Sequence, residues 1–114
     1  MSKLSFNTKF LGKEVGLPFG VAPTASHKLA HEEGEKILAS ISQKRDMVFT
    51  LSTLSSTSLT DIQAANKDGI RIMQVYVLKD REITLKQIKL AEKYGFSGIA
   101  ITVDAQVFGK RINN

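Results

Sequence analysis

The polar side chains best placed for chemistry come as two pairs, each with one residue between its members. Gln74 and Tyr76 form one pair, and Thr102 and Asp104 form the other. Because side chains alternate along a strand, both members of a pair would point to the same side and could hydrogen-bond one ligand. For Tyr76 the alternative is a packed ring with its hydroxyl in water. Asp104 directly follows the apolar run 98–103. A carboxylate at the end of such a run is costly unless it is paired, which favours a functional role for Asp104.

Two further segments are candidates for ligand contact. Residues 22–25 read Ala-Pro-Thr-Ala, in which the proline removes a backbone donor and the small neighbours let a flat ligand approach the main chain. The alternative is an ordinary strand-to-helix turn. Every residue of 52–58 except Leu54 carries a hydroxyl, although such runs also cap helices and fill loops.

Other familiar chemistries are weakly supported or excluded. His27, His31 and Glu35 lie four apart, which on a helix would align a metal-binding face, but the histidine pair lacks a well-placed third ligand and we expect no metal. The chain has no cysteine, which excludes disulfides and thiolate chemistry, and no glycine-rich phosphate loop. Arg111 could hold a carboxylate in its planar fork, although a basic terminal stretch is more often solvated.

Composition limits the partners. The 114 residues are 42% hydrophobic, and the net charge of +5 is scattered along the chain. Without a basic stripe interleaved with aromatics we expect no nucleic-acid binding, and without a long apolar run we expect no membrane span. No secretory signal or C-terminal peroxisomal signal is seen, so we expect an intracellular protein, cytoplasmic or peroxisomal.

Alternating apolar runs and helical periods predict the secondary structure. Strands are expected at 17–21, 47–51, 70–75 and 98–103, and helices at 29–42, from Ser58 through Ala65 with a Ser58–Asp61 cap, and at 83–94 with a stop at Gly95. The apolar faces of the two longer helices would be Ile37, Leu38 and Ile41, and Ile83, Leu85, Ile88, Leu90 and Ala91. Residues 1–16 would form an N-terminal hairpin or plug. The chain is expected to be a single partial domain over 1–114, with the strands in 17–114.

Two parallel architectures suit this order: an open doubly wound sheet, or part of a closed barrel. All four expected strands end in polar residues, whereas an open sheet concentrates its ligand groups at one switch point. This favours the barrel. The predicted fold is therefore α/β, a partial TIM (β/α)8 barrel of about four parallel βα units preceded by a short hairpin.

From about Phe6 to Asn114, the order and spacing of short segments match one family. The segments are Pro18, residues 22–25, 30–31 (Ala-His), 33–35 (Glu-Gly-Glu), 50–52 (Thr-Leu-Ser), 69–71 (Gly-Ile-Arg), 74–77 (Gln-Val-Tyr-Val), 79–81 (Lys-Asp-Arg), 91–92, 95–96, 101–104 (Ile-Thr-Val-Asp) and 109–111 (Gly-Lys-Arg). Together they resemble the FMN-dependent 2-hydroxy-acid oxidase and dehydrogenase family, which includes glycolate oxidase. The resemblance implies a TIM barrel that holds FMN at the C-terminal ends of its strands and oxidises a small 2-hydroxy acid to a 2-oxo acid.

The resemblance also implies roles for particular residues. The flavin would contact the backbone of Pro23, Thr24 and Ala25 and hydrogen-bond to Ser52, Gln74 and Thr102. Tyr76 would contact the substrate, Asp104 would orient a catalytic histidine, and Arg111 would lie near the substrate carboxylate. Two departures stand out: Ala105-Gln106 follows Asp104 where Thr-Pro is common, and Leu54 occupies a position that is often aromatic in glycolate-preferring members, which hints at a roomier pocket.

Family members carry the histidine base, an arginine clamp, a lysine near the flavin and the phosphate-binding loops later in their sequences, and neither His27 nor His31 matches the base. We therefore expect the chain alone to be inactive. In four strands without the rest of a barrel, the side chains that face the barrel interior would stay exposed. This would lose on the order of 10 to 20 kcal/mol of stabilisation, so self-association or a complementary half-barrel chain is expected. Two alternatives stay open: a non-catalytic relic or assembly module, and a small open-sheet ligand-binding protein.

Overall fold

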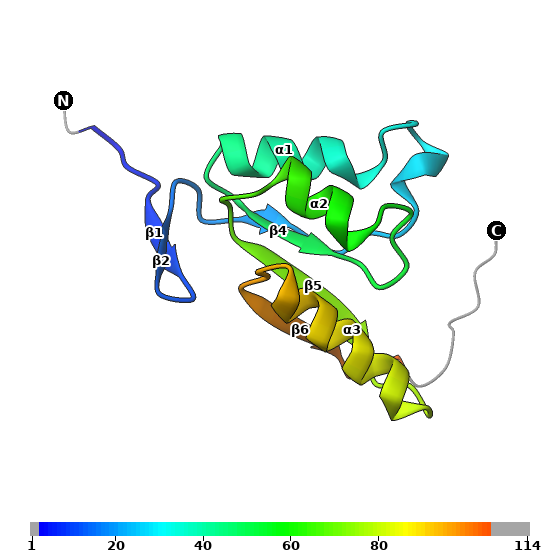
Figure 1. The fold of residues 1–114 in the computed structure, drawn as a ribbon. Coiled ribbons are helices and arrows are strands. Elements are labelled where there is room, and N and C mark those ends of the chain that lie inside the picture. The colour runs from blue at the N-terminus through cyan, green and yellow to red at the C-terminus, as the bar shows by residue number, and fades with distance from the viewer. Residues whose placement is uncertain (1–2, 106–114) are drawn as a thin grey trace.

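Four parallel strands pair side by side in the order in which they occur in the chain (Figure 1). They are β3 (Gly20–Val21), β4 (Val48–Leu51), β5 (Arg71–Tyr76) and β6 (Gly98–Thr102). The computed structural model describes residues 3–105. The four predicted strands are confirmed, although β3 is shorter than expected. The sequential order means that each connection steps across the sheet in the same direction.

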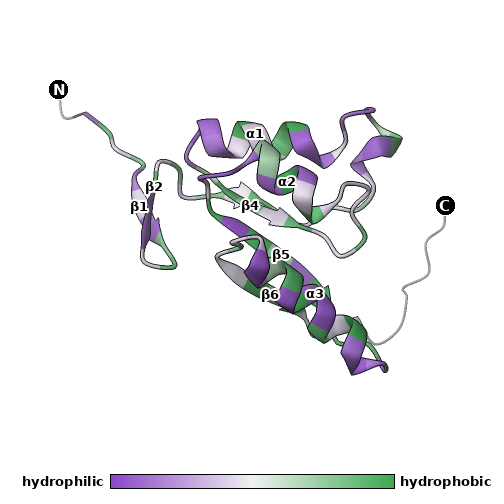
Figure 2. Cartoon of the chain, in the orientation of Figure 1, coloured by the Kyte–Doolittle hydropathy of each residue, from purple (hydrophilic) through white to green (hydrophobic). Residues whose placement is uncertain are grey.

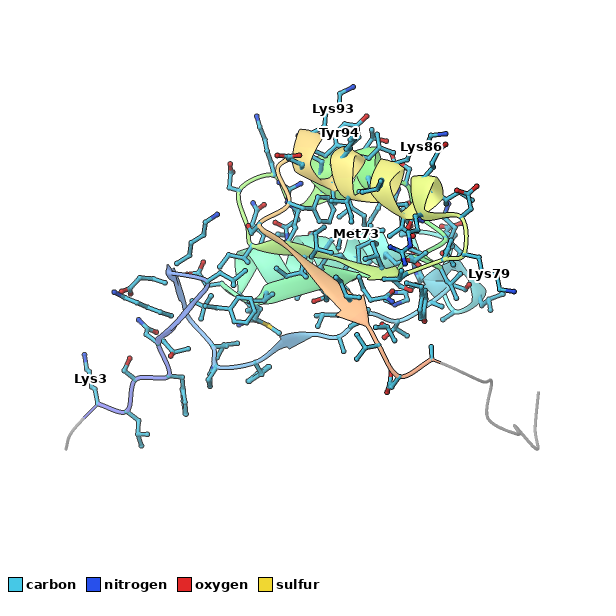
Figure 3. The ribbon with its side chains drawn as sticks, turned by 90° about the horizontal axis from the view of Figure 1, so that it is seen from below. Lys3, Met73, Lys79, Lys86, Lys93 and Tyr94 are labelled. Carbon is cyan, nitrogen blue, oxygen red and sulfur yellow. The ribbon has the colours of Figure 1, made fainter. Side chains whose placement is uncertain are left out.

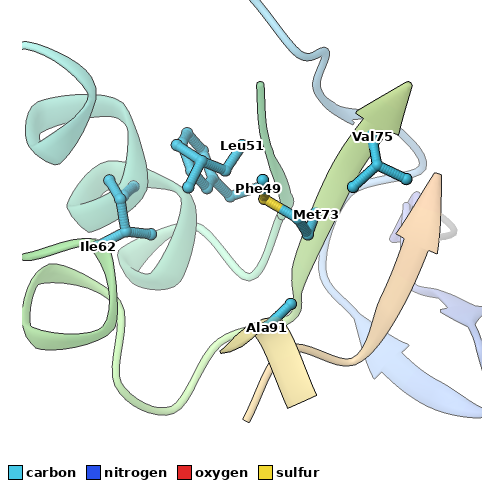
Figure 4. Packing of buried hydrophobic residues seen from close by; sticks show 7 residues of the cluster. Phe49, Leu51, Ile62, Met73, Val75 and Ala91 are labelled. Atoms are coloured by element: carbon cyan, nitrogen blue, oxygen red, sulfur yellow. The ribbon is translucent and has the colours of Figure 1, made fainter. Parts of the chain in front are cut away.

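Three α-helices connect these strands: α1 (Glu35–Lys44), α2 (Leu59–Ala65) and α3 (Arg81–Lys93). One residue from each helix, Ala39, Ile62 and Ala91 respectively, packs in the same buried cluster, which also contains Phe49, Leu51, Met73 and Val75 of the sheet (Figure 4). All three helices therefore cover one face of the sheet. Figure 3 shows α3 on that side, with Met73 beneath it. A doubly wound sheet carries helices on both faces, so that alternative is wrong and the predicted arc of a barrel is confirmed.

The opposite face of the sheet begins apolar and becomes polar along the strands. Near the strand starts, Val48, Ile70 and Ile72 pack with Val15. Val15 ends an antiparallel hairpin of β1 (Thr8–Phe10) and β2 (Lys13–Val15), which the Gly16 N–H to Asp46 carbonyl hydrogen bond (3.0 Å) ties to the sheet. The predicted N-terminal hairpin is confirmed, and it lies against the strand starts.

The first predicted helix begins later than expected. Residues 27–29 form a short 3-10 helix, η1 (His27–Leu29), and α1 starts only at Glu35 because Gly34 has a left-handed φ of 56°. The predicted apolar face is also wrong. Glu35, Ala39 and Ser42 are the buried residues, whereas Leu38 and Ile41 are 36% and 44% exposed. The helix thus rests on the sheet through small and polar residues.

The third helix repeats this pattern. Its buried residues are Thr84 and Ala91, while Ile83, Leu85 and Leu90 are exposed, and green apolar residues alternate with purple polar ones along its visible side (Figure 2). Ala91 alone of the predicted apolar face is fully buried. In a closed barrel the flanks of such a helix contact neighbouring helices of the outer ring, so apolar residues there do not mark the sheet-facing side.

The ends of α2 and α3 follow the predicted signals. The Ser58 hydroxyl accepts the Asp61 N–H at 3.2 Å, as the capping pattern predicts. Gly95 has φ 71° and lets the Phe96 N–H reach the Ala91 carbonyl at 2.9 Å. The buried Arg71 of β5 donates to the carbonyls of Tyr94 and Gly95 at 3.0 and 3.1 Å, which anchors the C-terminal end of α3 on the sheet.

Candidate functional site

Gln74 joins the C-terminal ends of three adjacent strands. Its Oε1 accepts the Thr53 N–H at 3.0 Å, and its Nε2 donates to Thr102 Oγ1 at 2.8 Å. The Thr53 hydroxyl also donates to the Gln74 backbone carbonyl at 2.5 Å. Only 4% of Gln74 is exposed, so the amide is held in one orientation between the loop after β4 and the end of β6. Two predicted site residues, Gln74 and Thr102, are thus brought together. Thr53 belongs to the hydroxyl-rich run 52–58 but was not singled out as a site residue.

Ser52 lies beside this amide. The register pairs Leu51 with Met73 at the end of β4, and continued by one residue it places Ser52 opposite Gln74. Ser52 is buried, and its Oγ accepts the Leu54 N–H at 3.1 Å. Among the hydrogen bonds of the described residues, the hydroxyl hydrogens of Ser52 and Thr102 and one N–H of Gln74 are not used. Three donors are therefore available at one edge of the sheet.

The loop after β3 lies next to this edge. Pro23, Thr24 and Ala25 are exposed, and the Thr24 hydroxyl donates to the Ala22 carbonyl at 3.3 Å. The Ser26 N–H donates to the Leu54 carbonyl at 3.3 Å, which joins this loop to the loop after β4. The exposed Pro-Thr-Ala backbone is thus open to a ligand at the end of the sheet where Ser52 lies.

A cavity of about 590 Å³ adjoins the ends of β5 and β6. Tyr76 and Thr102, which are partners in the strand register, supply its polar groups. The rest of the lining is apolar: Leu54, Val77, Leu78, Val103 and Ala105. The cavity therefore suits a ligand that combines a polar group with an apolar side chain.

One predicted residue, Asp104, lies apart from this arrangement. Asp104 is exposed beyond the end of β6, and its predicted functional role stays a prediction. Arg111 lies outside the described residues.

The possible metal face does not form. His27 belongs to η1, and His31 lies in the following turn, where its Nδ1 accepts the Glu33 N–H at 3.2 Å. No group of three metal-binding side chains occurs within residues 3–105.

Glu35 instead has a role that sequence reasoning missed. It is 1% exposed and accepts hydrogen bonds from His27, Ser56 and Thr57. Burial raises the pKa of this carboxyl, but these hydrogen bonds outweigh burial and lower the pKa to about 2. In the sequence Glu35 is separated from the hydroxyl-rich run 52–58, so no local pattern indicates these contacts.

Comparison with known proteins gives a consistent family. The sequence model of the FMN-dependent dehydrogenases matches residues 1–114. The chain is 40% identical over 111 residues to the peroxisomal (S)-2-hydroxyacid oxidase GLO3 of Arabidopsis thaliana, covering 97% of this chain and 30% of that protein. It is 36% identical over 111 residues to the glycolate oxidase of Spinacia oleracea, with the same coverage of 97% and 30%. The chain thus spans about 30% of the length of these relatives.

Solved structures agree with this assignment. The flavin-binding domain of baker's yeast flavocytochrome b2 superposes with a TM-score of 0.90 at 37% identity, covering 96% of this chain and 29% of that one. A mandelate oxidase with (S)-2-phenylpropionate gives 0.88 at 34% identity, covering 94% and 31%. No helix within the described residues is long and apolar enough to cross a membrane. The sheet β3–β6 is thus an arc of the TIM barrel that these flavoenzymes share, and the chain belongs to the FMN-dependent dehydrogenase family.

Proposed function

We propose that this chain supplies the flavin-ring face of an FMN-dependent enzyme that oxidises 2-hydroxy acids to 2-oxo acids. The observation that carries the proposal is the buried Gln74 amide, held between Thr53 and Thr102 with Ser52 opposite it. An amide fixed in this way is arranged before any ligand arrives, so little reorganisation accompanies binding. Family membership supplies the chemical context.

The residues at this edge fit the ring of FMN. A flavin is flat, and its pyrimidine edge carries two carbonyl oxygens and a ring nitrogen that accept hydrogen bonds, besides one N–H that donates. The three free donors of Ser52, Gln74 and Thr102 match such an edge. The exposed backbone of residues 23–25 offers a surface against which a flat ring can lie. When bound, FMN supplies the acceptor for the two electrons and the hydrogen removed from the substrate.

The remaining candidates are proposed to act on the substrate side. The Tyr76 hydroxyl, at the wall of the 590 Å³ cavity, would hydrogen-bond a substrate oxygen. Asp104 would orient a histidine base contributed by the part of the barrel beyond this chain, and Arg111 would hold the substrate carboxylate. The apolar remainder of the cavity, including Leu54, favours a 2-hydroxy acid with a side chain larger than that of glycolate.

We propose that this chain alone does not turn over substrate. General-base catalysis typically contributes about 10² to 10⁴ in rate, and the family's base lies beyond these residues. The complementary strands would come from further polypeptide, from a separate half-barrel chain or from a second copy. The exposed apolar flanks of α1 and α3 also favour a second candidate function, that of a non-catalytic assembly module.

A chimera tests the proposal. This chain would replace the matching 111 residues of the Spinacia oleracea glycolate oxidase. The proposal expects a yellow protein that oxidises a 2-hydroxy acid, and it expects Gln74→Leu to lower FMN occupancy while the matched Gln63→Leu on α2 does not. A chimera that unfolds cooperatively but stays colourless with added FMN would instead support the assembly module.

A further inference from the structure

Glu35 connects two loops that lie far apart in the sequence. Its Oε1 accepts the backbone N–H of His27 at 3.1 Å and that of Ser56 at 2.8 Å. Its Oε2 accepts the hydroxyls of Ser56 at 2.8 Å and of Thr57 at 2.5 Å. His27 belongs to the loop after β3, and Ser56 and Thr57 belong to the loop after β4. One buried carboxylate therefore holds both loops.

Each of the two anchored residues, His27 and Ser56, lies two residues after a segment that is a candidate for ligand binding. His27 follows Ala25 by two residues, and Ser56 follows Leu54 by two residues. The same loops are joined again where the Ser26 N–H meets the Leu54 carbonyl, and where the Lys28 N–H donates to Ser56 Oγ at 3.0 Å. The contacts with Glu35 thus lie just behind the two segments that face the strand ends.

From this arrangement we infer that Glu35 is a positioning residue, which sets the spacing between the loop that carries Pro23, Thr24 and Ala25 and the loop that carries Ser52. The inference rests on the proposed function, because these are the loops proposed to hold the flavin ring. Glu35 does not touch that site itself. It acts through His27 on one side and Ser56 on the other.

The chemistry of the contacts explains why a carboxylate occupies this position. Its partners are two backbone amides and two hydroxyls, and hydrogen bonds to an ionised acceptor are shorter and stronger than neutral ones. Glu35 is also the first residue of α1, where the helix dipole favours a negative charge. Both loops are therefore held to the start of α1, which packs on the sheet through Ala39.

Amide hydrogen exchange and flavin titration of the purified chain test the inference together. In Glu35→Ala, exchange at His27 and Ser56 should rise about tenfold or more, and the flavin dissociation constant should rise by about as much. Amides of β4 and β5, such as those of Phe49 and Val75, should keep their protection. Glu35→Gln keeps one oxygen that can accept both backbone amides, so it should restore most of the protection and of the affinity.

Glu33→Ala is the matched control. Glu33 is exposed, and its carboxylate pairs with Lys36 at 2.8 Å and accepts no hydrogen bond from His27, Ser56 or Thr57, so its removal should leave exchange and affinity unchanged. If Glu35→Ala does not fold, Thr57→Val removes one of the two hydroxyls bonded to Oε2 and leaves the carboxylate in place. It should raise exchange at Ser56 without affecting Val75.

Several results would overturn the inference. Unchanged exchange at His27 and Ser56 in Glu35→Ala would show that the carboxylate does not hold the loops. Faster exchange with unchanged flavin affinity would show that holding them does not serve the ligand. If wild-type protein binds no flavin at all, the proposed function fails, and the exchange data still decide whether Glu35 sets the spacing of the loops.

Discussion

Gln74 Nε2 donates to Thr102 Oγ1 across the β5–β6 pair at 2.8 Å, while Gln74 Oε1 accepts the N–H of Thr53 from the opposite side. A single side chain therefore spans the ends of three strands. The same amide that holds Thr53 and Thr102 also carries the second N–H that we propose to bind the flavin.

Replacing Gln74 with leucine should damage stability and binding together. The Thr53 N–H would lose its acceptor in a partly buried position, which is expected to cost about 1 to 3 kcal/mol of unfolding free energy. Urea denaturation measures this loss, and flavin titration should show weaker binding. Gln63→Leu on α2 is the control and should change neither. A Gln74→Leu protein as stable as wild type would contradict the bridging role.

The contacts of Arg71 lead to a prediction about stability alone. Its guanidinium donates to the carbonyls of Tyr94 and Gly95 and lies 5.1 Å from the centroid of the Phe96 ring. Arg71→Met should lower the unfolding free energy by about 2 to 3 kcal/mol, since charged hydrogen bonds to the end of α3 are lost. Arg81→Met, at the exposed start of α3, should cost less than about 0.5 kcal/mol. Equal effects of the two substitutions in urea denaturation would refute the anchoring of α3 by Arg71.

The unfolding free energy should fall at low pH in a way that depends on Glu35. We call this part of the plot of unfolding free energy against pH the acid limb. Its pKa is about 2 in the folded chain against 4.5 for the free group. Because the pKa of Glu35 is lower in the folded chain than in the unfolded chain, the ionised carboxylate stabilises the fold. Its contribution to the unfolding free energy is full above about pH 4.5 and is lost as the pH falls towards 2. A shift of this size corresponds to about 3 kcal/mol.

Unfolding free energies measured between pH 6 and pH 2.5 check the role of Glu35. Glu35→Gln cannot titrate and should show a flatter acid limb than wild type, while Glu33→Gln should keep a steep one. Parallel acid limbs for wild type and Glu35→Gln would contradict the assignment.

The exposed apolar surface predicts association of the isolated chain. Ile101 and Val103 at the end of β6 are 53% and 83% exposed, and the outer edges of β3 and β6 have no partner strand within the described residues. Sedimentation should show a mass that rises with concentration, and apolar dyes should bind. Val103→Lys should reduce both effects. A monodisperse wild-type monomer that unfolds cooperatively and binds no dye would exclude this expectation.

The strands and their polar ends were predictable because they depend on local signals. Apolar β-branched runs located β4, β5 and β6, and alternation along β5 placed Gln74 and Tyr76 on one side. The start of α1 was not predictable in the same way. The predicted helix included residues 29–34, whereas Gly34 has a φ of 56° and Glu35 accepts hydrogen bonds from the two loops.

The prediction of which helix faces are buried failed for a different reason. Leu38, Ile41, Ile83 and Leu90 follow a helical period, but small residues such as Ala39 and Ala91 allow the helix backbones to approach the sheet. Helical periodicity does not distinguish a side that faces the sheet from a side that faces a neighbouring helix. The part played by Thr53 depends on a contact across 21 residues, which no local pattern reports.

Flavin titration of the purified wild-type chain tests the central claim most directly, with riboflavin and FMN compared side by side. We propose that this chain binds the flavin ring and that the phosphate-binding residues lie outside it. Both flavins should then bind saturably, with dissociation constants that agree within about threefold, or ~0.7 kcal/mol. Quenching of flavin fluorescence reports the binding. Absence of saturable binding, or a strong preference for FMN over riboflavin, would contradict the account.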